Sequence, residues 1–186
     1  YPHSVGLLYG TFTDFLGFKP DNDEWKTMAL ASFSKSKNLY DKKMNSIYKL
    51  TKDGFELDLS FFDYYLFDRQ PHFYNKKLTS LFGKSRNKNE KITDKHHQVA
   101  GALQRAFTNI VFHLLKITKQ KGGKSNNIVI AGGAAMNCVF NGLLENHNTY
   151  KNNFIPPWPD DLGVSIGAAY LENHNLGKKS KNECQV

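Results

Sequence analysis

The residues best suited to chemistry lie between Asn127 and Leu144. Ile128–Ala131 is rich in β-branched residues and predicts a buried strand, after which Gly132 and Gly133 let the backbone turn sharply. Helix-forming residues then return from Ala135 onward. The first amides of a helix are unpaired donors where phosphates often bind, so this order predicts a nucleotide or anion site. The alternative is an ordinary α/β turn, since no Gly-Lys-Ser/Thr follows Gly132-Gly133 to make this turn a P-loop.

A second strand-to-helix junction carries carboxylates. Phe154-Ile155 predicts a short strand, and Val164–Leu171 predicts a helix of small residues. Asp160 and Asp161 lie between them, where an aspartate ordinarily caps a helix. Two successive strand-to-helix connections can bring both turns to one edge of a parallel sheet, where α/β ligand sites form. We therefore expect Asn137 and Asp161 to lie at one cleft.

Length and composition indicate a folded globular chain. The sequence has 186 residues, of which 40% are hydrophobic and 13% aromatic. It contains no apolar run of about 18 residues and no visible signal peptide, so we expect no membrane-spanning helix. Cys138 and Cys184 have neither metal-site spacing nor a disulfide framework, which favours a cytoplasmic location. We expect Cys138 to be a small buried residue.

The net charge of +8 could indicate binding of nucleic acid, but the distribution of the lysines argues against it. The lysines are scattered, and no stripe of interleaved aromatic and basic residues is present. A lysine-rich solvated surface accounts for this pattern, and it would also favour small ligands such as nucleoside phosphates.

Periodicity and turn residues predict the other elements. We expect helices over 4–16, 25–31, 73–82 and 93–119, a short helix within 35–45, a hairpin over 47–59 that turns at Asp53-Gly54, and a core-packing aromatic run over 61–67. Gly6 and Gly10 lie one turn apart on the first helix, where glycine costs about 1 kcal/mol relative to alanine. That helix face is therefore expected to pack closely against a neighbouring helix or a ligand.

Several segments, taken in order, resemble the nodulation-type O-carbamoyltransferases. They are His3–Tyr9, Phe15–Phe18, Asp23–Ala31, Asp53–Leu59, Ala100–Gln104, Ala131–Cys138 and Asp161–Ala168. The resemblance runs from His3 to about Leu171. It implies a partial actin-like ATPase (RNase H-like) subdomain of the α/β class, which is helix-rich with a short parallel sheet and an inserted β-hairpin. The tRNA threonylcarbamoyladenosine synthases share that fold.

The resemblance also implies a set of binding residues. Gly132, Gly133 and Asn137 match the family's Gly-Gly-x-x-x-Asn turn at the nucleotide, and Asp161 matches an aspartate that binds a metal. The nucleotide-side segments of the family further match Gly6, Glu24 and Lys26. No catalytic residue is assigned.

The implied reaction is an ATP-dependent carbamoyl transfer. Carbamoyl phosphate and ATP would give a carbamoyl-adenylate, whose carbamoyl group passes to a substrate hydroxyl. Adenylation supplies a good leaving group, and a divalent metal, iron or magnesium, can polarise the carbonyl or position phosphates. The sequence does not identify the hydroxyl acceptor.

The sequence also departs from the family. Met28–Ser34 lacks the glycines of the corresponding family loop, and the family's His-x-x-x-His metal pair and carbamoyl-phosphate domain are absent. We therefore interpret residues 1–175 as the C-terminal half of a carbamoyltransferase catalytic domain, with an insertion at about 35–92. Residues 176–186 are expected to be a polar tail or linker. The other metal ligands would lie outside this chain, and residues 1–186 alone are expected to be inactive.

Other interpretations remain open. A relative of the tRNA-modifying synthases would use its positive charge for tRNA, and salt-sensitive tRNA binding would favour it. A nucleotide-binding module without catalysis would bind nucleotide without turnover. Apolar faces left without their other half also predict an exposed hydrophobic patch, through which a homodimer could form.

Overall fold

A computed structural model describes residues 1–35, 39–66, 72–122 and 124–177. The chain divides into two compact units, Tyr1–Ser125 and Asn126–Val186. Helices dominate and the sheets are short, which confirms the prediction of a helix-rich α/β chain. The limits of a domain over 1–175 and of its insertion stay predictions. Most of the expected tail, residues 178–186, lies outside the described residues.

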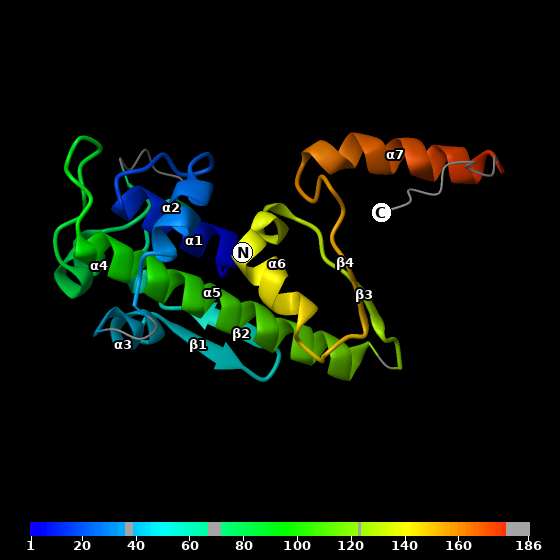
Figure 1. Cartoon of the computed structure of the whole chain (residues 1–186), viewed down its shortest axis with the longest axis horizontal. Coiled ribbons are helices and arrows are strands. Elements are labelled where there is room, and N and C mark those ends of the chain that lie inside the picture. The colour runs from blue at the N-terminus through cyan, green and yellow to red at the C-terminus, as the bar shows by residue number, and fades with distance from the viewer. Residues whose placement is uncertain (36–38, 67–71, 123, 178–186) are drawn as a thin grey trace. The chain divides into compact units, whose positions relative to one another are not determined.

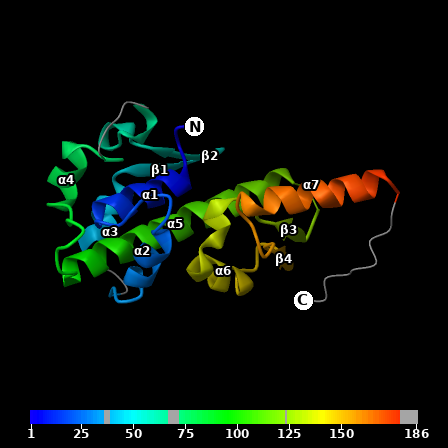
Figure 2. The ribbon, with the colours of Figure 1, turned by 90° about the horizontal axis from the view of Figure 1, so that it is seen from above.

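The first unit is built around one long helix, α5. Its elements are α1 Val5–Phe15, α2 Glu24–Ala31, α3 Leu39–Asn45, β1 Tyr48–Thr51, β2 Gly54–Leu57, the short 3₁₀ helices η1 Leu59–Phe61 and η2 Tyr64–Leu66, α4 Lys76–Phe82 and α5 Asp94–Lys121. Helices α1, α2 and α3 pack against α5 (Figure 1). The hairpin β1–β2 also lies beside it (Figure 2).

Helix α5 begins and ends close to the predicted residues. The backbone N–H of Thr93 donates to Nδ1 of His96 at 2.9 Å and closes the first turn, and Gly122 follows the last. One face of α5 is buried at Val99, Ala100, Leu103, Phe107, Ile110 and Ile117. Leu115 is also buried, whereas Leu114 is only half-buried.

Aromatic side chains fill the core of the first unit. The rings of Phe12 and Phe82 meet edge to face with centroids 5.0 Å apart, and Phe15 and Phe62 are fully buried. Burial of Phe62 confirms core packing for that part of the aromatic run, whereas Phe67 lies outside the described residues.

The hairpin is confirmed, but its turn is displaced by one residue. Thr51 pairs with Gly54, so the two connecting residues are Lys52 and Asp53. Gly54 therefore belongs to the second strand, and the predicted Asp53-Gly54 turn is wrong in detail. Hairpin turns favour glycine or asparagine at their centre, and that preference misplaced the turn.

Gly17 follows the C-cap of α1 at Leu16. Its φ of +73° lies in the region that glycine tolerates, and a side chain there would meet the carbonyl of Arg86. The buried Arg86 side chain donates from Nε to the carbonyl of Leu16 at 2.8 Å and so satisfies an acceptor at the end of α1.

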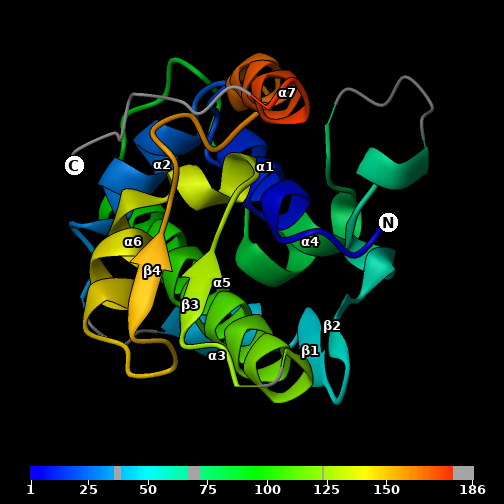
Figure 3. The same ribbon diagram turned by 90° about the vertical axis from the view of Figure 1, so that its right-hand side faces the viewer.

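The second unit contains a parallel strand pair and three helical segments. They are β3 Asn127–Val129, the 3₁₀ helix η3 Gly133–Met136, α6 Cys138–Glu145, β4 Asn152–Phe154 and α7 Leu162–Asn175. Figure 3 shows β3 and β4 side by side, with Ile128 opposite Asn153 in the register. The predicted short parallel sheet is confirmed, and the connection between its strands passes through α6.

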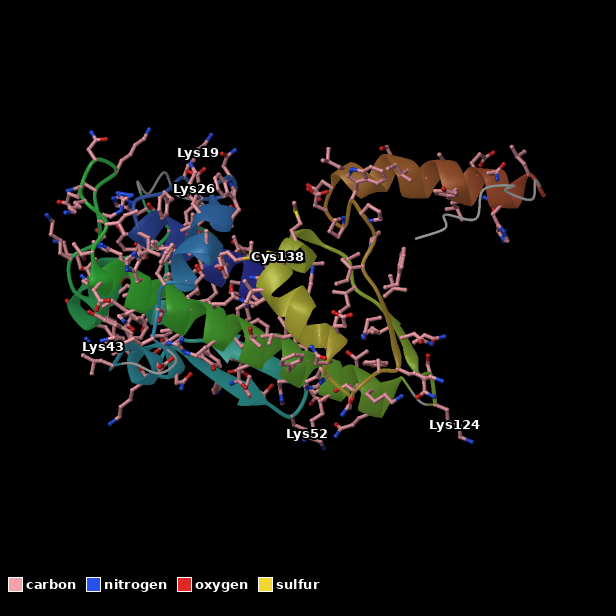
Figure 4. The ribbon with its side chains drawn as sticks, viewed as in Figure 1. Lys19, Lys26, Lys43, Lys52, Lys124 and Cys138 are labelled. Atoms are coloured by element: carbon pink, nitrogen blue, oxygen red, sulfur yellow. The ribbon has the colours of Figure 1, made fainter. Side chains whose placement is uncertain are left out.

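Three local predictions for the second unit are wrong. The first strand ends at Val129 and is not buried, since Val129 is 68% exposed. The α-helix begins at Cys138 rather than Ala135, because the chain first forms a 3₁₀ turn. Cys138 is exposed at the start of that helix, not buried (Figure 4).

Candidate functional site

The glycine turn after β3 is held in one defined shape. Gly132 has φ +101° and ψ 159°, a conformation that is essentially restricted to glycine. The carbonyl of Gly132 accepts from the amide of Ala135 at 2.9 Å, and the carbonyl of Ala134 accepts from the amide of Asn137 at 3.2 Å. The turn is therefore a single 3₁₀ turn set off from the strand by one left-handed residue.

Two consecutive amides of this turn are open. Among the described residues, the N–H groups of Gly133 and Ala134 make no hydrogen bond, and Gly133 is exposed. Adjacent free N–H groups at a glycine turn form the kind of concave donor that binds phosphate oxygens. The open amides therefore belong to Gly133 and Ala134, whereas Gly132 supplies the backbone conformation.

Asn137 caps the helix that follows the turn. Its Oδ1 accepts from the amide of Phe140 at 2.9 Å, and its carbonyl accepts from the amide of Asn141 at 3.0 Å. Its exposed fraction is 8%. The matched asparagine thus fixes the start of α6, and its predicted contact with a nucleotide stays a prediction.

The turn after β4 is bonded to the glycine turn. The amide of Gly132 donates to the carbonyl of Pro159 at 2.5 Å. Both turns follow the carboxyl ends of parallel strands, which end at the same edge of a sheet. This bond confirms the expectation that the two turns lie together. A cleft between Asn137 and Asp161 stays a prediction.

Gly163 allows the second turn to close. A Cβ at Gly163 would overlap the carbonyl oxygen of Trp158, and the amide of Gly163 donates to the carbonyl of Asp160 at 3.0 Å. Any larger residue would push the start of α7 away from this turn.

The two aspartates of the second turn differ in what they contact. Oδ1 of Asp160 accepts from the amide of Leu162 at 3.2 Å, so this side chain holds the turn. The carboxylate of Asp161 makes no hydrogen bond or ion pair with any described residue, and Asp161 is exposed. Asp161 is thus the aspartate of the pair whose charge is free for a cation or a ligand.

A carboxylate of this kind suits one position in the shell of magnesium or iron, because hard divalent cations prefer oxygen ligands. The described residues include no group of three or more His, Cys, Asp or Glu side chains arranged to hold a metal ion. Asp161 would therefore supply a single ligand from the described part of this chain.

Gly6, Glu24 and Lys26 belong to the first unit, whereas Gly132, Gly133, Asn137 and Asp161 belong to the second. Oε1 of Glu24 accepts from the amide of Asp21 at 2.7 Å, and Lys26 forms an ion pair with Asp23 at 2.7 Å. Gly6 is exposed. These contacts fix the entry into α2, and a nucleotide contact by these three residues stays a prediction.

Close packing, one of the two expectations for the glycine face of α1, is found at Gly10. A Cβ there would lie 3.6 Å from both Oε1 of Glu24 and the ring of Phe73. Both are ordinary van der Waals distances, so the packing around Gly10 would also admit an alanine.

The lysines of the first unit are distributed, as expected from the sequence. Figure 4 labels lysines on separate elements: Lys19 after α1, Lys26 on α2, Lys43 on α3 and Lys52 in the hairpin turn. Lys43 donates to the carbonyl of Leu81 at 2.7 Å near the C-terminal end of α4.

Two contributors to the site were missed from the sequence. Gly163 lies in the segment Asp161–Ala168 but was given no role of its own. A glycine two residues after an aspartate could have suggested a tight start to a helix. Asn141 lies one helical turn after Asn137, and its Nδ2 donates to the carbonyl of Ala135 at 2.8 Å. The repeated asparagine at this spacing was the available signal.

Comparison with known proteins assigns the family. Residues 1–170 match the family described as carbamoyltransferase N-terminus. The chain therefore belongs to the carbamoyltransferase family, which confirms the resemblance seen in its motifs.

Individual relatives agree with this assignment. The chain is 35% identical over 187 residues to an uncharacterized protein of Synechocystis, covering 96% of this chain and 30% of that protein. It is 30% identical to nodulation protein NolNO of Sinorhizobium fredii, covering 97% and 24%, and 29% identical to nodulation protein NolO of Bradyrhizobium diazoefficiens, covering 97% and 30%. The chain thus spans less than a third of the length of these relatives.

No helix among the described residues is long and apolar enough to cross a membrane.

Proposed function

We propose that this chain forms part of an ATP-dependent O-carbamoyltransferase. In the proposed reaction, carbamoyl phosphate would be hydrolysed to carbamate and phosphate, and carbamate would attack the α-phosphate of ATP and release pyrophosphate, which gives a carbamoyl-adenylate. The carbamoyl group would then pass to a substrate hydroxyl. The observation that carries the proposal is the bonded pair of turns, which presents the amides of Gly133 and Ala134 beside the turn that holds Asp161. Family membership supports carbamoyl transfer in general.

The roles of this chain's residues follow from their contacts. The open amides would bind nucleotide phosphate oxygens, and the left-handed Gly132 would hold those amides outward. Asp161 would hold a divalent metal together with ligands from elsewhere in the protein. When bound, the metal would offset phosphate charge and polarise the carbamoyl carbonyl.

The transfer step is balanced without a further reagent. The acceptor hydroxyl oxygen forms a bond to the carbamoyl carbon, the bond from that carbon to the AMP oxygen breaks, and the hydroxyl proton leaves to a base or to water. AMP is the leaving group, and because a phosphate anion is a far weaker base than an alkoxide or an amide anion, it leaves far more readily than either. We also propose that the fold is that of a partial actin-like ATPase.

The test is carbamoyl-adenylate formation by the full-length protein, followed by mass spectrometry with ATP, carbamoyl phosphate and either Mg²⁺ or Fe²⁺. Asp161→Asn removes a free charge and should lower adenylate formation by at least about 10–100-fold, the loss that follows even when a hydrogen-bond partner of a metal ligand is removed. Asp160→Asn is the matched control, because asparagine keeps an oxygen that can accept from the amide of Leu162.

The outcomes separate the alternatives. Adenylate that forms in the wild type and in Asp160→Asn, but not in Asp161→Asn, supports the proposal. Nucleotide binding without adenylate would favour the non-catalytic module, and salt-sensitive tRNA binding would favour the tRNA-modifying branch.

A further inference from the structure

The side chain of Asn141 reaches back from α6 onto the glycine turn. Its Nδ2 donates to the carbonyl of Ala135 at 2.8 Å, while the amide of Ala135 donates to the carbonyl of Gly132 at 2.9 Å. Ala135 is therefore bonded on both sides. At the other end of the turn, the amide of Gly132 is bonded to Pro159.

These contacts place the two open amides between two anchors. Gly133 and Ala134 follow Gly132, which the second turn holds, and precede Ala135, which Asn141 holds. The peptide groups between two fixed residues have little freedom to rotate. Phosphate binding by backbone amides depends on such fixed directions, since each donor must point at the same anion.

The carbonyl half of the Asn141 side-chain amide is without a partner in the part of the chain that the structure describes. Its Oδ1 is buried and makes no hydrogen bond with the described residues. A buried acceptor without a partner is unfavourable, and an apolar side chain at this position would avoid that cost. The asparagine is therefore better explained by the hydrogen bond that its Nδ2 donates to the turn than by simple packing of α6.

We propose that Asn141 is a positioning residue of the phosphate-binding turn: it holds the carbonyl of Ala135 so that the amides of Gly133 and Ala134 point together at a nucleotide phosphate. This inference rests on the proposed nucleotide-dependent function. It assigns to Asn141 a role distinct from that of Asn137, which caps α6.

The experiment measures equilibrium binding of a fluorescent ATP analogue with Mg²⁺ to the full-length protein, together with its melting temperature. Asn141→Leu removes both the donor and the unpaired acceptor at similar size, and Asn141→Ser is a smaller second variant in case the first does not fold. The control is Asn148→Ser, since Asn148 is exposed and its side chain makes no described hydrogen bond.

We expect the dissociation constant of folded Asn141→Leu and Asn141→Ser to rise on the order of tenfold, since small displacements of positioning groups are costly. Asn148→Ser should bind as the wild type does. The KM for ATP should rise while the KM for carbamoyl phosphate does not.

Each other outcome counts against the inference. Variants that melt earlier but bind the analogue with unchanged affinity would show that Asn141 is only structural. If the wild type binds the analogue and both Asn141 variants bind and melt as the wild type does, this inference is overturned and the proposed function is left intact. A wild type that does not bind the analogue would overturn both.

Discussion

The amide of Gly132 and the carbonyl of Pro159 are joined by a hydrogen bond of 2.5 Å. One residue belongs to the turn after β3 and the other to the turn after β4, so a single bond links the two junctions that the sequence marked as candidate sites. The bonded pair of turns therefore contains the unpaired amides of Gly133 and Ala134 together with the carboxylate of Asp161, which has no partner among the described residues.

The first prediction concerns the left-handed residue. Gly132→Ala should destabilise the turn by about 1–3 kcal/mol, because its φ of +101° disfavours any side chain although no atom lies within 4 Å. Nucleotide affinity should fall as the turn relaxes. Gly142→Ala on α6 is the control, which should stabilise by about 0.5–1 kcal/mol. Denaturant unfolding measures the change in stability of both variants. Equal changes would contradict the claim that the positive φ of Gly132 requires glycine.

The second prediction concerns the closing of the second turn. Gly163→Ala places a Cβ against the carbonyl of Trp158, so the first turn of α7 must move and Asp161 must move with it. We expect weaker metal-dependent nucleotide binding by Gly163→Ala. Gly167→Ala in the middle of α7 has open space and should bind normally. If both variants bind nucleotide as the wild type does, Gly163 does not influence the binding site.

The third prediction is a pH dependence of stability. Burial, with help from Lys95 and Arg86, lowers the pKa of His96 below its ordinary value near 6.5, and His96 accepts from the amide of Thr93 in its neutral form. As the pH falls through 6.5, the unfolded state binds a proton that the folded state resists, so stability should fall.

His96→Gln tests this prediction, because glutamine at this position can still accept from Thr93 without titrating. Unfolding midpoints between pH 7.5 and 5.5 should fall less steeply for His96→Gln than for the wild type. Parallel slopes would show that other groups control this pH range.

The fourth prediction concerns the apolar surface of α7. None of its residues is buried, and Leu162, Val164 and Leu171 are 68%, 69% and 62% exposed. Apolar residues on several sides of a helix favour burial against other protein. Residues 1–186 alone should therefore bind a hydrophobic dye, and Val164→Lys with Leu171→Lys should reduce the signal.

Sedimentation of the same samples tests the homodimer. Self-association that the two lysine substitutions abolish would assign this surface to pairing of two copies. A monomer that binds no dye would contradict the expected hydrophobic patch.

Local chemistry made much of the fold predictable. Ser4 and Thr93 cap α1 and α5, and Gly17 and Gly122 follow them, so the predicted bounds 4–16 and 93–119 lie within about two residues of the observed helix ends. These signals depend only on neighbouring residues. The prediction that the strand before Gly132 is buried was wrong. β-Branched residues indicate a strand, whereas its burial depends on what covers it.

The candidate site was predictable in part. Parallel pairing of β3 and β4 and the meeting of their turns followed from the order of elements. The different contacts of Asp160 and Asp161 could not be predicted, because the two residues are adjacent and both acidic. Only the path of the backbone determines which carboxylate reaches an amide. The return of the Asn141 side chain to Ala135 likewise depends on the 3₁₀ turn, which periodicity did not indicate.

The most direct test of the account is amide hydrogen exchange at the two turns of the full-length protein, with and without ATP and Mg²⁺. The account predicts that exchange slows at Gly133 and Ala134 when nucleotide binds, while the hairpin turn at Lys52 and Asp53 stays unchanged. Protection elsewhere, with unchanged exchange at Gly133 and Ala134, would contradict the assignment of this glycine turn to the nucleotide.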